Sequence, residues 1–119
     1  MSKLAQSMPA DLMFRALSDP TRLRILHLLL AGELCVCDLV AVIAVPQPTA
    51  SRHLAYLRRT HLVVPRREGA WIYYALTPAK TAFHKKLLEC LALSSGQVRE
   101  ISGDKVRIRA LQKSTTRCC

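Results

Sequence analysis

The chain has 119 residues, half of them hydrophobic, and its 18 Lys and Arg against 8 Asp and Glu give a net charge of +10. This length corresponds to one domain and excludes a large multidomain enzyme. A chain of this size buries roughly 65% of the surface that it exposes when unfolded, so it forms a core without disulfides or a metal ion.

The cysteines and the apolar segments indicate where the protein works. There are five cysteines, an odd number, and no apolar signal segment follows Met1. We therefore expect free thiols in a reducing cytoplasm. Charged residues interrupt the most hydrophobic stretch, residues 25–45, which falls short of the ~18 uninterrupted apolar residues of a membrane span. No membrane partner is expected.

The positive charge is confined to one part of the chain. Residues 1–45 hold four basic and four acidic residues, so residues 46–119 hold 14 basic and 4 acidic residues and the whole excess of +10. Such an asymmetry is typical of a protein with a polyanionic partner, but a solvated basic surface explains the charge alone equally well.

Two helices are expected first. Apolar spacing predicts a helix over residues 10–17. Asp19 followed by Pro20 is a start signal, because the carboxylate accepts a bond from an early backbone N–H and proline at the first helical position loses none. This signal predicts a second helix that ends near Gly32.

A helix-turn-helix follows. The pattern predicts a short third helix over residues 36–43, a turn over 44–46 and a fourth helix over 47–59. Pro48 fits the first turn of the fourth helix. The residues expected to face inward are Leu39, Ile43, Leu54 and Leu57.

A hairpin and a last helix complete the expected domain. Strands over 62–66 and 70–76 flank a turn that contains Gly69, and Pro65 predicts an edge strand. Thr77 before Pro78 predicts the start of a fifth helix that runs to about residue 93. We assign residues 8–94 to a DNA-binding and dimerisation domain and residues 95–119 to a basic C-terminal tail.

The start of the fourth helix carries side chains suited to DNA. In a helix-turn-helix this end reaches base edges in the major groove. Gln and Arg form bidentate bonds to base edges, and hydroxyls contact bases or phosphates. Basic residues on the helix end and at the hairpin tip would neutralise phosphates. The expected DNA-binding residues are Gln47, Thr49, Ser51, Arg52, His53, Arg58, Arg66 and Arg67.

Cys35 and Cys37 form a second motif. In a regular α-helix two residues at this spacing point about 200° apart, so they cannot share one ion there. Cys35 precedes Asp38 by the spacing of a capping box, which predicts Cys35 as the N-cap at an exposed helix start. Closing both sulfurs on one centre then disturbs only the first turn. Soft thiolates select thiophilic ions, and arsenite or antimonite fits this pair better than zinc does.

Residues 10–76 resemble the ArsR/SmtB winged-helix repressors. The blocks that carry the resemblance are ALSDPTRLRIL (16–26), GELCVCDL (32–39), ASRHLAYLR (50–58) and RREGAWIYYAL (66–76). The resemblance implies a mainly α winged helix-turn-helix with a small β-hairpin that forms a homodimer through its first and last helices. It also implies an inverted-repeat operator and release on binding a metal or metalloid. In the block that holds His53, the histidine packs or contacts phosphate instead of reading bases.

The CVCDL block resembles the arsenic-responsive branch of that family. There the two cysteines are the core ligands and a third, three residues on, completes a trigonal site; here that position is Val40. Two options stay open, an exogenous third ligand or a third thiol from elsewhere in the chain. The thiols available are Cys118, Cys119 and Cys90.

The sequence thus predicts a metalloid-responsive transcriptional repressor of arsenical resistance. As(III) or Sb(III) is the expected inducer, bound at Cys35 and Cys37, and no organic cofactor is expected. The alternative is a winged-helix repressor switched by thiol oxidation or persulfidation. An enzyme is not expected, because the chain has neither a Cys-x-x-Cys motif nor a phosphate-binding loop.

Overall fold

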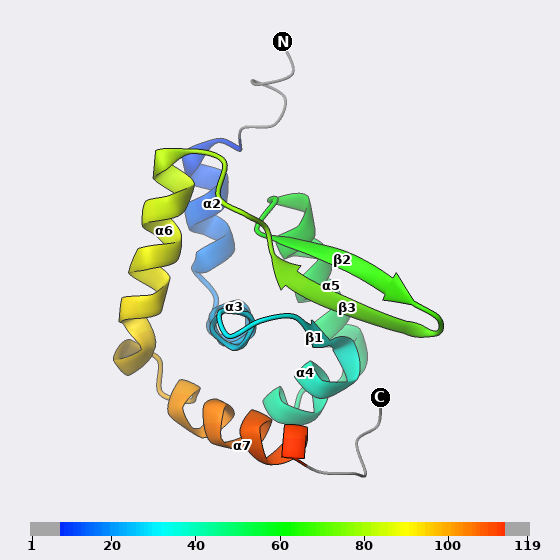
Figure 1. The fold of residues 1–119 in the computed structure, drawn as a ribbon. Helices are drawn as coiled ribbons and strands as arrows, with labels where there is room; N and C mark the ends of the chain where they lie inside the picture. Colours follow the sequence, from blue (N-terminus) through cyan, green and yellow to red (C-terminus); the bar gives the residue numbers. More distant parts are fainter. Residues whose placement is uncertain (1–7, 114–119) are drawn as a thin grey trace.

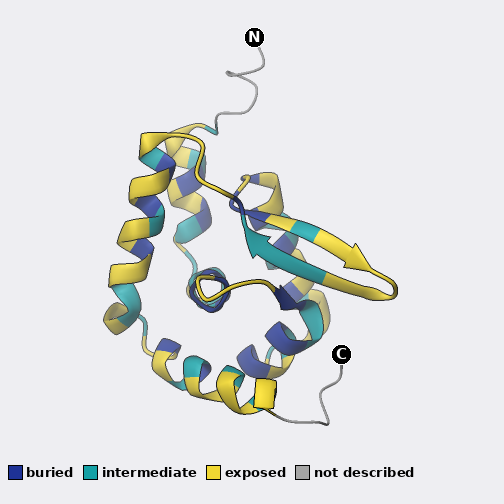
Figure 2. Ribbon diagram, in the orientation of Figure 1, coloured by how far each residue is buried: buried dark blue, intermediate teal, exposed yellow. Residues whose placement is uncertain are grey.

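The computed structural model describes residues 8–113 (Figure 1). Its elements are α2 (Ala10–Leu17), α3 (Pro20–Leu29), β1 (Leu34–Cys35), α4 (Val36–Ile43), α5 (Gln47–Arg59), β2 (Val63–Glu68), β3 (Trp71–Leu76), α6 (Ala82–Leu93), the 3-10 helix η1 (Ser94–Gln97) and α7 (Ile101–Lys113). The other helices and the sheet surround α3, and Figure 2 shows that the buried residues face this centre. Within residues 8–113 no helix combines the length and hydropathy that crossing a membrane requires.

The helix-turn-helix of α4 and α5 has the predicted bounds, and α3 starts at the predicted residue. Asp19 accepts a hydrogen bond from the Arg22 backbone N–H at 3.0 Å, and Pro20 is the first residue of α3, as expected. Ala44 ends α4 in the left-handed conformation, with φ 62°. The four side chains predicted to face inward are buried: Leu39, Ile43, Leu54 and Leu57.

The hairpin of β2 and β3, which we call the wing, differs in detail from the prediction. β2 and β3 are antiparallel and pair up to Glu68 and Trp71, so the turn is Gly69 and Ala70, with Gly69 at φ 61°. Arg66 and Arg67 therefore lie within β2, and their expected position at the hairpin tip is wrong. Because the strand order is β1-β3-β2, β2 is an edge strand, as Pro65 predicted.

The sheet has a third strand that was not expected. β1 is only two residues long and pairs with β3, with Leu34 opposite Tyr74 and Cys35 opposite Tyr73. A segment this short has no alternating pattern that could reveal it. It ties the residue before α4 directly to the wing.

α6 begins four residues later than predicted. The backbone N–H of Thr77 donates to the Leu62 carbonyl at 3.0 Å, which extends the wing and keeps Thr77 out of a helix. Thr81 is the N-cap instead, because its hydroxyl accepts from the His84 backbone N–H at 3.1 Å. Thr81 offers the same capping hydroxyl as Thr77, and it lies beyond the hydrogen bond to Leu62 that keeps Thr77 with the wing.

α7 packs against α3 and α4, and a buried carboxylate holds it there. Asp104 is 1% exposed and accepts two hydrogen bonds from Arg24, at 2.8 and 2.9 Å, and one from Arg107. Arg24 also donates to the Ile43 carbonyl at 3.1 Å, and Arg107 donates to the Val42 carbonyl at 3.2 Å. The bonds to Asp104 raise the pKa of Arg24. This cluster fixes the C-terminal end of α4.

Two histidines, His27 and His84, are buried. The Ser94 hydroxyl donates to the Leu91 carbonyl at 2.8 Å, so the His27 Nε2 atom, 3.0 Å from that hydroxyl, is the donor between them. Among the described residues, His27 Nδ1 and His84 Nε2 have no hydrogen-bond partner. Burial lowers the pKa of both histidines, and the charge of Lys105 lowers that of His27 further.

The lowered pKa values of these histidines predict a loss of stability at mildly acidic pH. The unfolded chain binds protons on them near pH 6.5 and the folded chain only at lower pH, so the free energy of unfolding falls as the pH drops below about 6.5. Urea unfolding between pH 8 and pH 5 measures this. The variant with both His27→Gln and His84→Gln should show a flatter dependence, whereas H61N at an exposed position should not. An unchanged slope in the double variant would contradict the assignment.

Candidate functional site

The exposed face of α5 carries most of the predicted DNA-binding residues. Gln47, Ser51, Arg52 and Arg58 are exposed, and Thr49 is half-buried beneath Arg52, whose guanidinium donates to the Thr49 hydroxyl at 3.4 Å. Six of the eight predicted residues thus lie on α5, and five of them share its exposed face. It presents their polar groups to solvent beside the wing (Figure 1).

His53 lies on a different side of α5. Its Nδ1 atom is 3.3 Å from an Arg22 guanidinium nitrogen and 3.8 Å from an Asp19 carboxylate oxygen. The imidazole therefore contacts the start of α3 within the protomer.

Arg22 connects three helices, and the sequence analysis missed it. Its guanidinium donates to the Ala16 carbonyl at 2.7 Å and to the Arg15 carbonyl at 3.1 Å, at the end of α2. It also lies 4.2 Å from the centre of the Tyr56 ring on α5, within the range of a cation–π contact. Arg22 thus sets where α5 sits on the rest of the fold. No signal in the sequence distinguishes it from a surface arginine.

The two arginines of the wing differ in their surroundings. Arg66 forms salt bridges with Glu33 at 2.7 Å and with Glu68 at 2.7 Å, and it lies 4.7 Å from the centre of the Tyr73 ring. The bond from Arg66 lowers the pKa of Glu33, and both carboxylates raise the pKa of Arg66. Arg67 is exposed and takes part in no salt bridge within residues 8–113. Arg66 therefore connects β2 to Glu33, the residue before β1, whereas the charge of Arg67 is available to a ligand.

Cys35 is the N-cap of α4, as predicted. Its backbone is extended, with φ −79° and ψ 156°, and its side chain makes no capping hydrogen bond. The expected exposed helix start is wrong, because Cys35 is 1% exposed where β1 pairs with β3. Cys37 is a half-buried free thiol, whereas Cys35 is disulfide-bonded. Both sulfurs become available to a ligand only in the reduced protein.

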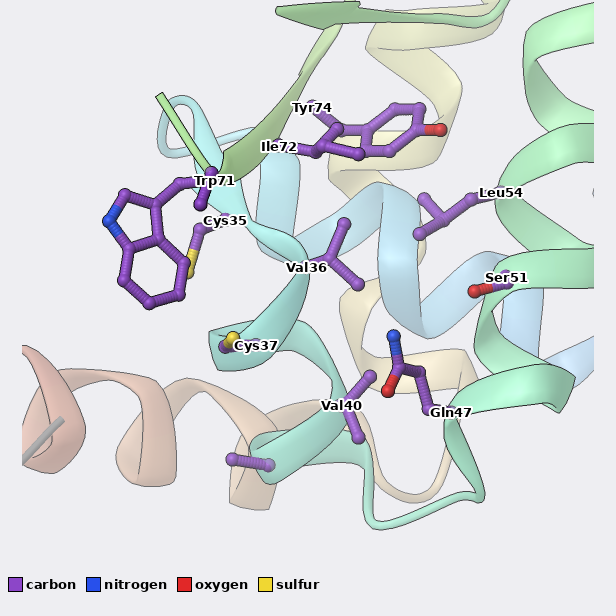
Figure 3. Close-up of a pocket in the computed structure, with 12 residues that line it drawn as sticks. Cys35, Val36, Cys37, Val40, Gln47, Ser51, Leu54, Trp71, Ile72 and Tyr74 are labelled. Carbon is purple, nitrogen blue, oxygen red and sulfur yellow. The ribbon is translucent and has the colours of Figure 1, made fainter. Parts of the chain in front are cut away.

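Cys35 and Cys37 open into one cavity with the start of α5. The cavity has a volume of about 520 Å³ and lies between α4, α5 and β3 (Figure 3). Its walls are thiol, apolar and aromatic side chains, with two polar groups from α5. The lining residues are Cys35, Val36, Cys37, Val40, Ala41, Gln47, Ser51, Leu54, Ala70, Trp71, Ile72 and Tyr74.

A third ligand is not supplied by the part of the chain that the structure describes. Residues 8–113 contain no group of three Cys, His, Asp or Glu side chains that could hold a metal ion. Cys90 is an exposed free thiol on α6, and the structure does not bring it together with Cys35 and Cys37. Cys118 and Cys119 lie outside the described residues. Two sulfurs without nitrogen or oxygen ligands suit a thiophilic centre and not zinc, calcium or magnesium.

A helix-turn-helix followed by a two-stranded wing defines a winged-helix DNA-binding regulator. The chain belongs to the arsR family of bacterial regulatory proteins, whose family model matches residues 19–63. This confirms the predicted fold class and the resemblance on which the sequence analysis relied.

Named relatives agree with this assignment. The arsenical resistance operon repressor of Escherichia coli K12 is 45% identical over 78 residues, which are 65% of this chain and 67% of that protein. The arsenic resistance transcriptional regulator ArsR2 of Pseudomonas putida KT2440 is 40% identical over 90 residues, 75% of this chain and 77% of that protein.

A solved structure has the same fold. The transcriptional repressor BigR of Xylella fastidiosa superposes with a TM-score of 0.62 at 35% identity, covering 76% of this chain and 86% of that one. The family and these relatives are transcriptional regulators, so the chain is a regulator of transcription and not an enzyme.

Proposed function

We propose that the chain is a homodimeric repressor that binds an inverted-repeat operator and releases it when As(III) or Sb(III) binds Cys35 and Cys37. One observation carries this proposal: a single cavity is lined by both cysteines and by Gln47 and Ser51 of the DNA-reading helix. Relatives named as arsenical resistance regulators support the choice of inducer.

The coupling follows from the geometry of α4. Cys35 is the N-cap and Cys37 lies in the first turn, so a centre bound to both sulfurs distorts that turn. Because the Arg24–Asp104–Arg107 cluster holds the C-terminal end of α4, the distortion is confined to its N-terminal turn, which shares the cavity with Gln47 and Ser51 of α5. Pairing of Cys35 with Tyr73 carries the same movement into the wing. The two DNA-contacting elements then lose their relative position.

An apolar surface supports the homodimer. Phe14 on α2 is 54% exposed, and its ring lies 5.5 Å from the Phe83 ring on α6 in an edge-to-face contact. Leu93, at the end of α6, is 85% exposed. A second copy that covers α2 and α6 would remove these side chains from water and would set two recognition helices about 34 Å apart, one turn of DNA.

Operator titration tests the proposal. In a phosphine reductant, which keeps Cys35 reduced and adds no competing thiol, arsenite should weaken operator binding by about 5–150-fold, the range of a coupling free energy of ~1–3 kcal/mol. The double variant C35S and C37S should bind the operator normally and ignore arsenite. C90S, a matched change at the exposed thiol of α6, should respond as the unmodified chain does. Release of the double variant by arsenite would refute the proposed site.

A switch by thiol oxidation is the second candidate, and the disulfide at Cys35 favours it. It predicts that an oxidant alone releases the operator and that a reductant restores binding. The metalloid proposal predicts release by arsenite while the reductant is present. The two therefore give opposite results in the same titration.

A further inference from the structure

We propose that a second cavity, between the end of α3 and α7, binds a small organic carboxylate with a short alkyl or aryl body, and that this ligand strengthens operator binding. The cavity has a volume of about 400 Å³, within the range of about 300–1,000 Å³ typical of small-molecule sites. It shares no lining residue with the cavity of Cys35 and Cys37. The proposal therefore adds a site that the metalloid switch does not use.

One face of α7 forms one wall of this cavity. α7 packs against α3, and Figure 1 shows it running below that helix. Four residues of α7, spaced by three or four positions, line the cavity from the same side of the helix: Lys105, Ile108, Arg109 and Gln112. This wall therefore offers two cations and an amide around one apolar side chain.

The opposite wall is the end of α3 and the segment that leads to β1. It includes the buried side chains of His27, Leu28 and Leu34. At about pH 7.5 His27 is uncharged, because burial lowers its pKa from the ordinary value of 6.5. The Glu33 carboxylate also lines the cavity, but it is paired with Arg66 at 2.7 Å. This wall is therefore mainly apolar, and its one acidic group is already neutralised.

The two cations of α7 lack a counterion. Neither Lys105 nor Arg109 forms a salt bridge with another residue of the described range 8–113, although Lys105 is half-buried. The charge of Lys105 lowers the pKa of His27, so the ammonium group acts on the wall across the cavity. Like charges four residues apart on a helix also destabilise it. An anion bound between these two side chains would relieve that repulsion.

The two walls together fit a carboxylate with an apolar body. The carboxylate would accept hydrogen bonds from the Lys105 ammonium and from the Arg109 guanidinium, whose fork suits two carboxylate oxygens. The body would lie against Leu28 and Leu34 and displace water from them. A small inorganic anion would leave that wall wet, and a neutral apolar molecule would leave the cations unpaired. The site therefore selects molecules that combine both groups.

The cavity adjoins the cluster that holds α4, which gives its ligand a route to DNA. Asp104, the neighbour of Lys105, accepts two hydrogen bonds from Arg24, and Arg24 also donates to the Ile43 carbonyl at the end of α4. A ligand that ties α7 to α3 would therefore hold the end of α4, the turn after it and the position of α5. We expect operator affinity to rise by about fivefold, the lower end of the range for coupling between two sites.

Heteronuclear NMR titration of the reduced full chain with benzoate and with hexanoate tests the site. Each should shift the amide signals of α7 and of the end of α3, with a Kd near or below about 1 mM, as expected for ligands of this size. Benzamide and hexanamide lack the charge and acetate lacks the apolar body, so each should bind at least about tenfold more weakly. Equal binding of the amides and the carboxylates would overturn the recognition of charge.

Two double variants with the same loss of charge test the role of the cations. K105Q with R109Q should abolish the preference for carboxylates over amides. R99Q with K113Q removes two positive charges that do not line the cavity and should keep the preference. If K105Q with R109Q retained it, the proposed site would be wrong.

A second pair of variants tests the cavity itself. A31L places a larger side chain into it from the segment after α3 and should abolish binding of both carboxylates. A110L is the same change at an exposed position of α7 that does not line the cavity, and it should bind them normally. Circular dichroism shows whether both variants are folded. Normal binding by a folded A31L would place the ligand elsewhere and overturn the site.

Operator titration with saturating benzoate tests the effect on DNA, with acetate at the same ionic strength as the reference. Affinity should rise about fivefold in the unmodified chain and in C35S with C37S, and should not rise in K105Q with R109Q. Benzoate binding without a change in operator affinity would overturn the effect on DNA and leave the site. These outcomes are independent of the metalloid switch, which is measured by arsenite without any added carboxylate.

Discussion

Replacing Asp104 by alanine is expected to lower the free energy of unfolding by about 3–5 kcal/mol, the cost of removing one partner from a buried ion pair. Asp104 is 1% exposed and accepts both bonds of the Arg24 fork, while Arg24 is itself 13% exposed. Without the carboxylate, this largely buried guanidinium stays beside the end of α4 with the Ile43 carbonyl as its remaining hydrogen-bond acceptor. Urea unfolding followed by circular dichroism gives the change.

Two further variants identify the cause. E89A removes an exposed carboxylate whose bridge to Lys86 spans 3.3 Å, and exposed pairs of this kind contribute only ~0.2–1 kcal/mol. The double variant R24M and D104L replaces the pair by apolar groups and should recover much of the loss, because no unpaired charge is left buried. If D104A behaved like E89A, the cluster would not be what holds α7 and α4 together.

The sequence predicted the helices wherever a local signal marks their ends. Asp19 before Pro20, and Cys35 before the apolar run of α4, mark helix starts that do not depend on contacts with distant residues. The same kind of local signal placed the start of α6 at Thr77. The sequence does not show that the Leu62 carbonyl, which precedes the wing, accepts a hydrogen bond from the Thr77 backbone N–H.

Features that depend on distant residues were not predictable. β1 exists because it pairs with β3, about 40 residues later, and α7 is fixed by Asp104, a residue type that sequence reasoning assigns to the surface. The cavity needs three elements from separate parts of the chain. The motif could therefore predict the two sulfurs and their position at the helix start, but not the apolar space in front of them or the burial of Cys35.

The double variant R58Q and R67Q is expected to weaken operator binding by on the order of 100-fold at physiological salt and to reduce the salt dependence of binding. Both side chains are exposed, one at the end of α5 and one on the wing. In the proposed homodimer the variant removes four phosphate contacts, and each contact contributes about 0.9 to the slope of log K against log salt. The slope should therefore fall by roughly 3–4.

Arg66 provides the matched comparison, because it neighbours Arg67 on the same strand with its charge already paired to Glu33 and Glu68. R66Q should leave the salt slope nearly unchanged. Its effect should appear in unfolding experiments or in the protease sensitivity of the wing, because it frees the loop before β1 from β2. Titrations of a fluorescent operator at several salt concentrations measure both variants. If R66Q lowered the salt slope as much as the single variant R67Q does, the ion pairs of Arg66 would open on DNA and both arginines would contact phosphate.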